Sequence, residues 1–403
     1  MVAVKLKGKA DQGERMNFDL TDEQKKIREM ARDFARKVIA PRAEEVERTG
    51  EYPYDIMAQM ASLGIMGIPF PKEYGGGGGD WVSMHLCIEE LSRGDVSMGA
   101  LLDVTTSVVA NEIYTFGTEE QKQKWLIPLA QGKAIGAFGL TEPDAGSDTA
   151  SLKTTAVLEG EEWVINGSKQ FITNIGLDNA SIIVITAKTR VEQNGKMTVS
   201  TLVVPKDAPG FTLGQRYEKM TFHASATHEV FFDDCHIPKD HLLGDINKGL
   251  AQHLSVLQTG RISVAAISTG LAQACLDEAL AYTTRGFRFR QPLMESQTIP
   301  FKIADIAMMI ELSRTMYLKA AWLKDEGKDY TLEAHFAKLF ATETAKKIAS
   351  DVLNIYGLLG CLDEYPVSRY FKVAKLFEIV EGTSEMQRLV IARELLGKNY
   401  FVI

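Results

Sequence analysis

The sequence predicts an α+β multidomain fold, with an N-terminal all-α domain, a middle antiparallel β-domain of barrel-like form and a C-terminal four-helix bundle. Three observations lead to this prediction. The chain has 403 residues, which is too long for one ordinary hydrophobic core. Helical periodicity marks both ends of the chain. The stretch between them consists of short β-rich runs separated by Gly, Asn and Asp.

The N-terminal part is expected to be a loose extension over residues 1–15 and a helical domain over residues 16–136. The first helix begins at Thr21, which forms a capping-box pattern with Gln24 ahead of an amphipathic stretch. The glycine run at 75–79 is interpreted as a surface turn, because a phosphate-binding loop would need a preceding strand and a Lys-Ser/Thr pair. Further helix-like stretches cover residues 54–64, 81–93, 98–115 and 119–131.

The middle and C-terminal parts follow from a change of periodicity. Residues 137–246 alternate β-rich runs with turn signals such as LEGEEW and INGSK, which is typical of an antiparallel barrel or sandwich. Residues 247–403 return to long helical periodicity and predict the bundle. Its four expected helices cover residues 249–284, 295–326, 331–356 and 384–396.

Composition excludes several classes of function. The 53 acidic against 45 basic residues give a net charge of -8, which argues against nucleic acid as a partner. The 4 cysteines are scattered, so no metal site or disulfide framework is expected. No run approaches the roughly 18 apolar residues of a membrane span, so no membrane insertion is expected. The basic N-terminus lacks the apolar core of a signal peptide, so a cytoplasmic, bacterial-type protein is expected, with the mitochondrial matrix as an open alternative.

The string GLTEPDAGSDTA, residues 139–150, lies where the helical pattern gives way to strands. Gly146 and Ser147, flanked by Thr141 and Asp148, offer backbone N–H groups and hydroxyls that could bind a phosphate or a polar ring. A capped turn without a ligand is the alternative interpretation.

A second string, SKQFITN, covers residues 168–174 at the end of a predicted strand. Phe171 and Thr173 are two residues apart and therefore share one face, where they could stack on and hydrogen-bond a flat heterocycle. Strand alternation also produces such pairs by chance, so the string is weak on its own.

A third string covers residues 364–395 and contains Glu381. This carboxylate follows Ile379 and Val380, and it precedes Gly382 and a helix with a second capping-box pattern. It is a candidate general base, because apolar neighbours raise its pKa while the helix N-terminus lowers it. An ordinary first-turn Glu stabilised by the helix dipole is the alternative.

Together the three strings resemble the acyl-CoA dehydrogenase family, through GLTEPDAGSD and EGTSEMQR and from about residue 16 to residue 396. The resemblance implies FAD bound between the β-domain and the bundle, a site completed by a neighbouring subunit, and a homotetramer. It also implies a reaction: a base removes an α-proton from an acyl-CoA, the flavin takes the β-hydride, and trans-2-enoyl-CoA results. Electrons would then pass to an electron-transferring flavoprotein.

The same resemblance assigns roles to individual residues. Glu381 falls on the position of the catalytic base. Some members carry the base on a bundle helix immediately before an Arg, and here Gly260 precedes Arg261, so the two positions are consistent as alternatives. The expected FAD-binding residues are Phe138, Leu140, Thr141, Gly146, Ser147, Phe171, Thr173, Arg288, Gln297, Asn354, Gly357, Thr383 and Glu385. The expected substrate residues are Ser147, Arg261, Gly382, Asp103 and Val380.

The sequence departs from the family pattern at the adenosine end of the cofactor. Gly286 stands where an Arg for the pyrophosphate is usual, and Arg285 or Arg288 could substitute for it. Asn354 replaces a Gln and Val373 replaces an Asp.

The acyl pocket also departs from the pattern. Val380 replaces a common Tyr, and Gly99 offers no Arg of the kind that binds the distal carboxylate in glutaryl-CoA dehydrogenases. Asp103 falls on a helix that often walls the acyl chain, unless it points to solvent or pairs with a local amide. Three hypotheses stay open. They are a straight- or branched-chain acyl-CoA dehydrogenase, a relative specialised for a cyclic or aromatic acyl group with Asp103 as a second acid or base, and a non-catalytic binding or assembly protein.

Overall fold

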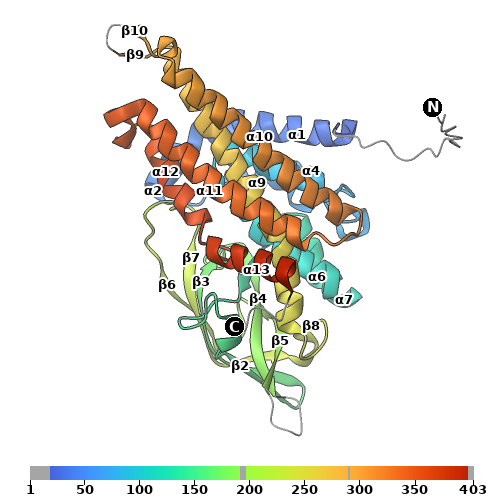
Figure 1. Cartoon of the computed structure of the whole chain (residues 1–403). Coiled ribbons are helices and arrows are strands. Elements are labelled where there is room, and N and C mark those ends of the chain that lie inside the picture. Colours follow the sequence, from blue (N-terminus) through green and yellow to red (C-terminus); the bar gives the residue numbers. More distant parts are fainter. Residues whose placement is uncertain (1–18, 191–196, 289–290, 398–403) are drawn as a thin grey trace, which may run out of the picture.

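The computed structural model describes residues 19–190, 197–288 and 291–397, and the side chains of 190, 197 and 288 are outside this description. The loose extension predicted for residues 1–15 therefore lies outside the described residues. The described chain has helices at both ends and a sheet between them (Figure 1). The α, β, α order predicted from the sequence is confirmed.

The N-terminal helices begin at the capping box predicted at Thr21, whose side chain accepts from Gln24 N while the Gln24 side chain accepts from Thr21 N. The helix expected over residues 98–115 is one continuous rod with a π-helical middle, and that middle begins at Asp103. The elements are α1 (Asp22–Phe34), α2 (Ala43–Thr49), α3 (Tyr54–Ser62), α4 (Trp81–Gly94), α5 (Val96–Leu102), the π-helical η5 (Asp103–Ala110), α6 (Asn111–Phe116), α7 (Glu119–Gln121) and α8 (Ile127–Ala130).

The central sheet is mixed rather than wholly antiparallel. Strand β4 pairs in parallel with β1 and with β2. The chain enters the sheet from the helical domain along β1, and the connections between these strands are crossovers, so β4 runs in the same direction as both neighbours. The strand order is β6-β7-β3-β2-β4-β5-β8, in which every pairing except β2 with β4 is antiparallel, and the described ends β6 and β8 do not pair with each other. The strands are β1 (Ile135–Gly139), β2 (Thr155–Glu159), β3 (Glu162–Thr173), β4 (Ala180–Arg190), β5 (Met197–Pro205), β6 (Phe211–Arg216), β7 (Thr227–Pro238) and β8 (Leu242–Leu243).

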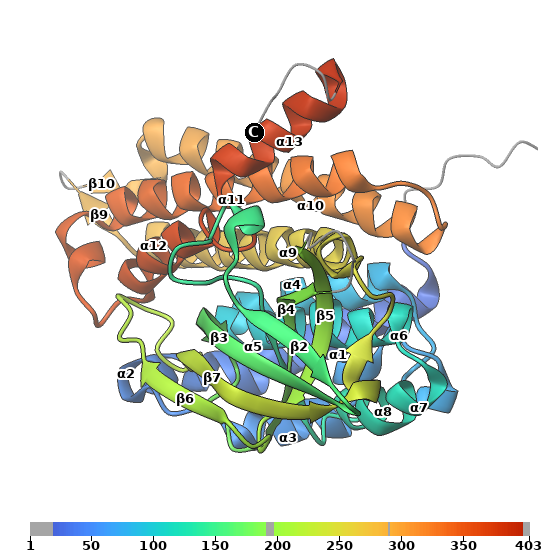
Figure 2. The same ribbon diagram turned by 90° about the horizontal axis from the view of Figure 1, so that it is seen from below.

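The C-terminal bundle differs from the prediction in its fourth helix. The helix predicted at residues 384–396 exists, but it projects away from the other bundle helices (Figure 2). The fourth packed helix is instead α12, which begins with Pro366 at a position where a missing N–H costs nothing. The helices are α9 (Gly249–Thr283), α10 (Thr298–Asp325), α11 (Thr331–Tyr356), α12 (Pro366–Phe377) and α13 (Ser384–Leu396), with a short hairpin of β9 (Phe287–Arg288) and β10 (Gln291–Pro292) before α10.

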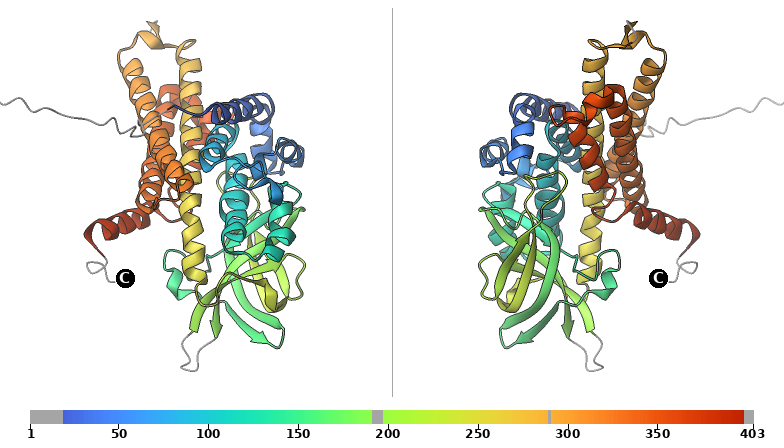
Figure 3. Two further views of the ribbon diagram at one scale, coloured as in Figure 1. Left: turned by 90° about the vertical axis from the view of Figure 1, so that its right-hand side faces the viewer. Right: turned by 90° about the vertical axis from the view of Figure 1, so that its left-hand side faces the viewer.

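Helix α9 is the element that joins the parts. One core of buried apolar side chains runs from the N-terminal helices into the bundle, and α9 packs against α4, α10 and α11 within it. A second core fills the sheet, and a third lies between the sheet and the N-terminal helices. Figure 3 shows α9 extending from the bundle to the sheet. Within the described residues no helix is long and apolar enough to cross a membrane.

Candidate active site

The segment that carries Glu381 is the tight turn between α12 and α13. Ser384 N donates to Glu378 O across this turn at 3.1 Å, and Thr383 caps α13 by accepting from Met386 N. Glu381 has φ 53°, in the left-handed region that a non-Gly residue adopts only when its surroundings enforce it. The backbone is therefore held in a strained conformation at the candidate base.

Three buried side chains hold this turn in place. Lys338 on α11 donates from Nζ to Gly382 O at 2.8 Å and to Glu378 O at 3.3 Å. Gln387 on α13 donates from Nε2 to Gly382 O at 2.7 Å and to Glu381 O at 3.3 Å. His335 Nδ1 lies 2.5 Å from Gln387 Oε1 and orients that amide. We call Lys338, Gln387 and His335 the turn clamp.

The carboxylate of Glu381 lies against the backbone of α9 at Gly260. A Cβ at position 260 would stand 2.3 Å from Glu381 Oε2 and 3.0 Å from its carboxyl carbon. A side chain at position 260 would therefore require the Glu381 carboxylate to move. This contact agrees with the expectation that the two positions are alternatives for one carboxylate.

Asp103 is buried beside the same carboxylate, with 3% of its surface exposed. The alternative in which it points to solvent is therefore wrong. Its side chain interacts with Glu381 and with Ser263, one turn along α9 from Gly260. Burial, and then the charge of Glu381, raise the pKa of Asp103 well above its usual range, while Ser263 acts to lower it.

Two cations from different helices act on Glu381. Burial raises the pKa of Glu381, and contacts with Asp103, Arg261 and Lys338 oppose that rise. Arg261 Nε is buried without a hydrogen-bond acceptor among the described residues. Burial lowers the pKa of Lys338 to about 8. The carboxylate thus combines an apolar surrounding with nearby positive charge, as a base working near neutral pH requires.

The strings at residues 139–150 and 168–174 are brought together by a buried ion pair. Lys169 Nζ on β3 donates to Glu142 Oε1 at 2.8 Å and to Leu140 O at 3.2 Å. Gln170 N also donates to Thr141 O at 2.8 Å. Glu142 further accepts from the backbone N–H groups of Lys153 and Thr154. The loop that follows β1 is therefore fixed against the end of β3.

The edge formed by these two strings offers aromatic and polar groups to a ligand. Phe171 is 57% exposed, has φ 59° and lies 4.9 Å from the Tyr217 ring. Gly146 and Ser147 are exposed on the loop, and a Cβ at Gly146 would meet no described atom within 4 Å. An exposed aromatic ring beside an open glycine-containing loop fits the ring system and phosphates of a dinucleotide.

Phe138, Leu140, Thr141 and Thr173 are half-buried next to that edge. The Phe138 ring stacks on the His253 ring of α9, with centroids 3.7 Å apart and planes 11° apart. The expected flavin-facing residues of the β-domain thus lie at its junction with α9.

The remaining predicted residues lie elsewhere in the single chain. Gln297, Asn354 and Gly357 are exposed at the end of the bundle, where Lys302 on α10 pairs with Asp351 on α11. Asn354 is 16 positions from Lys338 along α11, which corresponds to about 24 Å. These residues cannot reach a ligand at Glu381 of their own chain unless the ligand is long.

The other departures have clear local reasons. A Cβ at Gly286 would stand 2.5 Å from Leu293 Cδ1, so a longer residue there would have to displace Leu293, and the Arg288 side chain lies outside the described residues. Val373 is buried in the bundle core. A Cβ at Gly99 would stand 1.9 Å from Ser92 Oγ, so any side chain at that position would have to displace the Ser92 hydroxyl. Thr383 and Glu385 lie at the start of α13, directly after the base turn.

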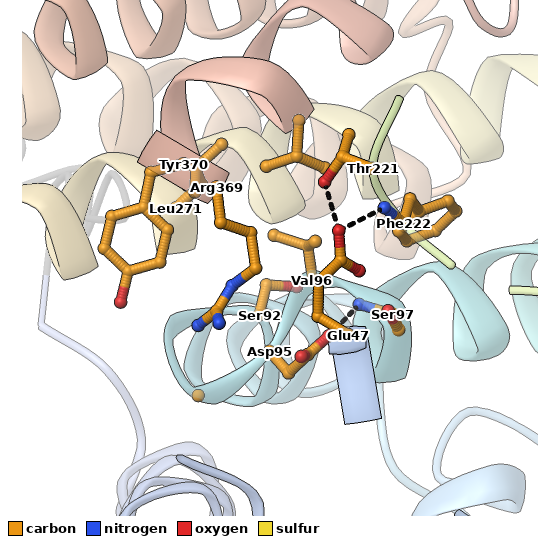
Figure 4. Close-up of a pocket in the computed structure, with 12 residues that line it drawn as sticks. Glu47, Ser92, Asp95, Val96, Ser97, Thr221, Phe222, Leu271, Arg369 and Tyr370 are labelled. Atoms are coloured by element: carbon orange, nitrogen blue, oxygen red, sulfur yellow. Dashed lines mark hydrogen bonds between the residues drawn. The ribbon is translucent and has the colours of Figure 1, made fainter. Parts of the chain in front are cut away.

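Two cavities lie away from this site. The smaller is lined by Glu47, Asp95 and Arg369 among others, and its Glu47 carboxylate accepts from Thr221 and Phe222 (Figure 4). The larger, of about 600 Å³, is lined by side chains of both charges between α1 and α12. In the described parts of the chain no group of three His, Cys, Asp or Glu side chains could hold a metal ion.

The site predicts a class of chemistry before any comparison. Glu381 has a strained backbone, one buried carboxylate oxygen and nearby positive charge, and such a group is suited to removing a proton from carbon. The exposed Phe171 ring and the open loop at 139–150 are suited to a flat cofactor that accepts electrons. The protein has N-terminal helices, a central sheet and a C-terminal bundle, together with a tuned carboxylate and a surface for a flat cofactor. These features define the class of cofactor-dependent dehydrogenases.

Known proteins that are similar to this chain belong to the same class. The chain matches the acyl-CoA dehydrogenase N-terminal domain over residues 21–133, the middle domain over 137–235 and the C-terminal domain over 247–396. A probable acyl-CoA dehydrogenase of Bacillus subtilis (strain 168) is 50% identical over 94% of this chain and 100% of its own length.

Two solved structures are also similar. The butyryl-CoA dehydrogenase of Megasphaera elsdenii has a TM-score of 0.91 and 40% identity over 94% of this chain and 100% of its own. A chain from the electron transferring flavoprotein study of Acidaminococcus fermentans has a TM-score of 0.91 and 41% identity, with the same coverage.

The chain therefore belongs to the acyl-CoA dehydrogenase family, whose members are FAD-dependent oxidoreductases. The family and the fold expected from the sequence are confirmed. The turn clamp was not expected. Lys338 and His335 are distant from Glu381 in the sequence. The helical pattern in which they lie predicts an ordinary packed helix.

Proposed function

We propose that this enzyme dehydrogenates an acyl-CoA thioester to the trans-2-enoyl-CoA with Glu381 as the base. The observation that carries the proposal is the contact between Glu381 Oε2 and Gly260, in which the absence of a side chain on α9 leaves space for the carboxylate. Glu381 accepts the α-proton as the C–H bond breaks. Bound FAD supplies the hydride acceptor for the β-carbon.

The FAD would be held by the edge of the sheet and by the loop at 139–150. Phe138, Leu140, Thr141, Phe171 and Thr173 would contact the ring system, and Gly146 and Ser147 the phosphates and the ligand. Support comes from the open space at Gly146, the exposed Phe171 ring and the fixed loop. A related glutaryl-CoA dehydrogenase of Mycobacterium smegmatis has been solved with FADH2.

The proposed acyl group is short and unbranched. Relatives at 40–41% identity are described as short-chain specific acyl-CoA dehydrogenases, from Megasphaera elsdenii and Clostridium acetobutylicum. Asp103 and Val380 would wall the acyl tail, while Gly382, Ser147 and Arg261 would lie along the thioester side. The proposed electron acceptor is an electron-transferring flavoprotein, in line with the Acidaminococcus fermentans study.

A homotetramer would complete the cofactor site. Gln297, Asn354, Gly357 and Arg288 lie at the far end of the bundle, so they would serve a neighbouring subunit, with Thr383 and Glu385 next to the base. The outer face of α10 supports self-association, because Phe301, Met308 and Leu312 are 62%, 56% and 45% exposed there. We place the enzyme in the cytoplasm.

A second candidate is the same dehydrogenation on a cyclic or aromatic acyl group. The observation that favours it is Asp103, a buried carboxyl beside Glu381 that could serve as a second acid or base. The two candidates differ in substrate and share the fold, the cofactor and the base.

A panel of acyl-CoA esters separates the candidates. Purified protein is titrated anaerobically with linear, branched, cyclic and aromatic esters while the flavin absorbance is recorded, and the products are identified by mass. Bleaching by butyryl-CoA in preference to cyclic esters supports the first candidate. Bleaching by cyclic esters alone supports the second. A protein purified without flavin, and unable to take it up, contradicts both.

A further inference from the structure

The carboxyl groups of Asp103 and Glu381 meet in a place where neither is otherwise satisfied. Asp103 Oδ1 and Glu381 Oε2 are both buried, and no donor from any other described residue reaches them. The two side chains interact, since each shifts the pKa of the other. Two carboxyl oxygens that lack any other donor can be satisfied together only if one carboxyl carries a proton and donates it to the other.

We propose that Asp103 and Glu381 form a carboxylic acid–carboxylate pair that holds a single proton, that Asp103 carries this proton, and that it thereby donates a hydrogen bond to the ionised base. Asp103 is then a positioning residue for Glu381. The inference rests on the proposed role of Glu381. It goes beyond that role by stating the protonation of the site before substrate binds.

The charges around the pair decide which carboxyl keeps the proton. Arg261 and Lys338 both act on Glu381 and favour its ionised form. Among the described residues no cation acts on Asp103 in this way, and the Ser263 hydroxyl is the group that lowers its pKa. Two neighbouring buried carboxyl groups disfavour ionisation of both, so the proton stays on the group without a cation. The raised pKa of Asp103 agrees with this assignment.

The other titratable groups near the pair do not change which carboxyl holds the proton. His85 on α4 lies 3.2 Å from Ser263 Oγ, and burial lowers its pKa to about 4, so it is neutral near pH 7. Burial likewise lowers the pKa of His335 to about 4. The charged groups that act on the pair are Arg261 on α9 and Lys338 on α11. Around them lie His85 on α4, which contacts Ser263, His335 on α11 and Tyr330 before α11, which act on Arg261, and Glu378 in the base turn, which acts on Lys338.

The shared proton has two consequences for the reaction. A neutral Asp103 can wall an aliphatic acyl tail without the cost of burying a charge. Its O–H also fixes one oxygen of Glu381, which leaves the other free to face the α-carbon. When the α-C–H bond breaks, the proton goes to Glu381, so the pair holds two protons until one is released.

Infrared difference spectroscopy tests the proton directly, without turnover. In H₂O against D₂O near pH 7, the wild type is expected to have a protonated carboxyl C=O band that Asp103→Asn removes. Glu381→Gln is expected to shift this band without abolishing it, because the acceptor becomes an amide. The control is Asp95→Asn, another buried carboxyl with a raised pKa, for which Asn is an equally good helix cap. A band that is unchanged in Asp103→Asn overturns the proposal.

A pair of variants at position 103 gives a second readout. Asp103→Asn keeps a neutral donor, so kcat/KM should stay within about tenfold of wild type, with an unchanged acid limb of its pH profile. Asp103→Leu removes the donor, so the acid limb should move up by roughly one pH unit. Equal and severe loss in both variants would overturn the proposal and favour Asp103 as an acid–base in its own right. If Glu381→Gln keeps full activity, the base assignment fails instead. The loss of the band in Asp103→Asn still tests the proton separately, because it is measured without turnover.

Discussion

At the scale of single residues, the site depends on the absence of a side chain at Gly260. Gly260 leaves the space that Glu381 Oε2 occupies, and any Cβ there would come within 2.3 Å of this oxygen. A glycine within a long helix costs about 1 kcal/mol relative to alanine. The helix therefore accepts a loss of intrinsic stability at the position where the carboxylate has to lie.

Gly260→Ala should separate stability from activity. The added methyl group should displace the Glu381 carboxylate, and kcat/KM should fall by about 10²-fold, as expected for a misplacement of about 1 Å. Thermal unfolding should change little, because alanine favours the helix. Steady-state kinetics and the melting temperature, measured on one preparation, check both halves. Unchanged kcat/KM would show that the carboxylate is not held against α9.

The turn clamp makes a second prediction at this scale. Lys338→Met removes the buried donor to Gly382 O and Glu378 O, which should cost about 1–3 kcal/mol of stability and lower kcat/KM at least tenfold. Lys346→Met is the matched control, because Lys346 lies on the same helix and pairs with Glu378 at 3.6 Å near the surface. Equal effects of the two variants on kcat/KM would contradict the role of the clamp.

Some of these residues could be predicted from the sequence and others could not. Glu381 has apolar residues before it and a capped helix after it, and this local pattern is enough to indicate a candidate base. Lys338 and His335 lie more than 40 positions from Glu381 in a helix with ordinary periodicity, and only the tertiary fold brings them to the turn. The burial of Asp103 likewise depends on how η5 packs on α9.

At the scale of elements, the buried pair of Glu142 and Lys169 fixes the loop at 139–150 against β3. Lys169→Met should leave the Glu142 carboxylate buried without its cation, at a cost of about 3–5 kcal/mol, and should weaken FAD retention. Lys153→Met is the control, since its pair with Asp144 is exposed and worth at most about 1 kcal/mol. Denaturant unfolding and flavin content report the two effects. Similar losses in both variants would contradict the importance of burial.

Helix α4 carries a pH-dependent contribution. His85 Nδ1 lies 2.7 Å from Trp81 O, a pure acceptor, so the neutral ring carries its proton on Nδ1. Burial lowers the pKa of His85 from 6.5 to about 4, so the unfolded chain takes up this proton first as the pH falls. The stability from neutral His85 is complete above pH 6.5 and is lost between pH 6.5 and about 4, by roughly 3 kcal/mol.

The measurement is the free energy of unfolding against pH for wild type and His85→Gln. The variant should lose less stability on acidification across this interval. His236→Gln, at an exposed histidine beside Glu162, is the control and should follow the wild type. A variant curve parallel to that of the wild type would contradict the contribution of His85.

The elements themselves were largely predictable, and their assembly less so. The capping pattern at Thr21 correctly predicted the start of α1, and the return of helical periodicity after residue 248 correctly predicted α9. The parallel pairing of β4 with β1 and β2 was missed, because period-two alternation reports a strand without reporting its partner or direction. The packed helix α12 was missed because its residues were interpreted only as the approach to Glu381.

At the scale of the whole molecule, the exposed apolar face of α10 predicts association. A Phe301→Glu, Met308→Glu double variant should shift the protein toward smaller species in analytical ultracentrifugation. It should also retain FAD less well, because the proposed adenosine-end residues act on a neighbouring subunit. The control is Leu63→Glu, at an exposed leucine near the end of α3. An unchanged sedimentation profile in the double variant would contradict this interface.

The central claim is that Glu381 is the base of an acyl-CoA dehydrogenase. The most direct test is anaerobic addition of butyryl-CoA to the wild type and to Glu381→Gln, with both proteins at equal flavin content. The account predicts rapid loss of the oxidised flavin absorbance and formation of the enoyl-CoA in the wild type. It predicts bound FAD that is not bleached in the variant. Bleaching of Glu381→Gln at the wild-type rate would contradict the claim.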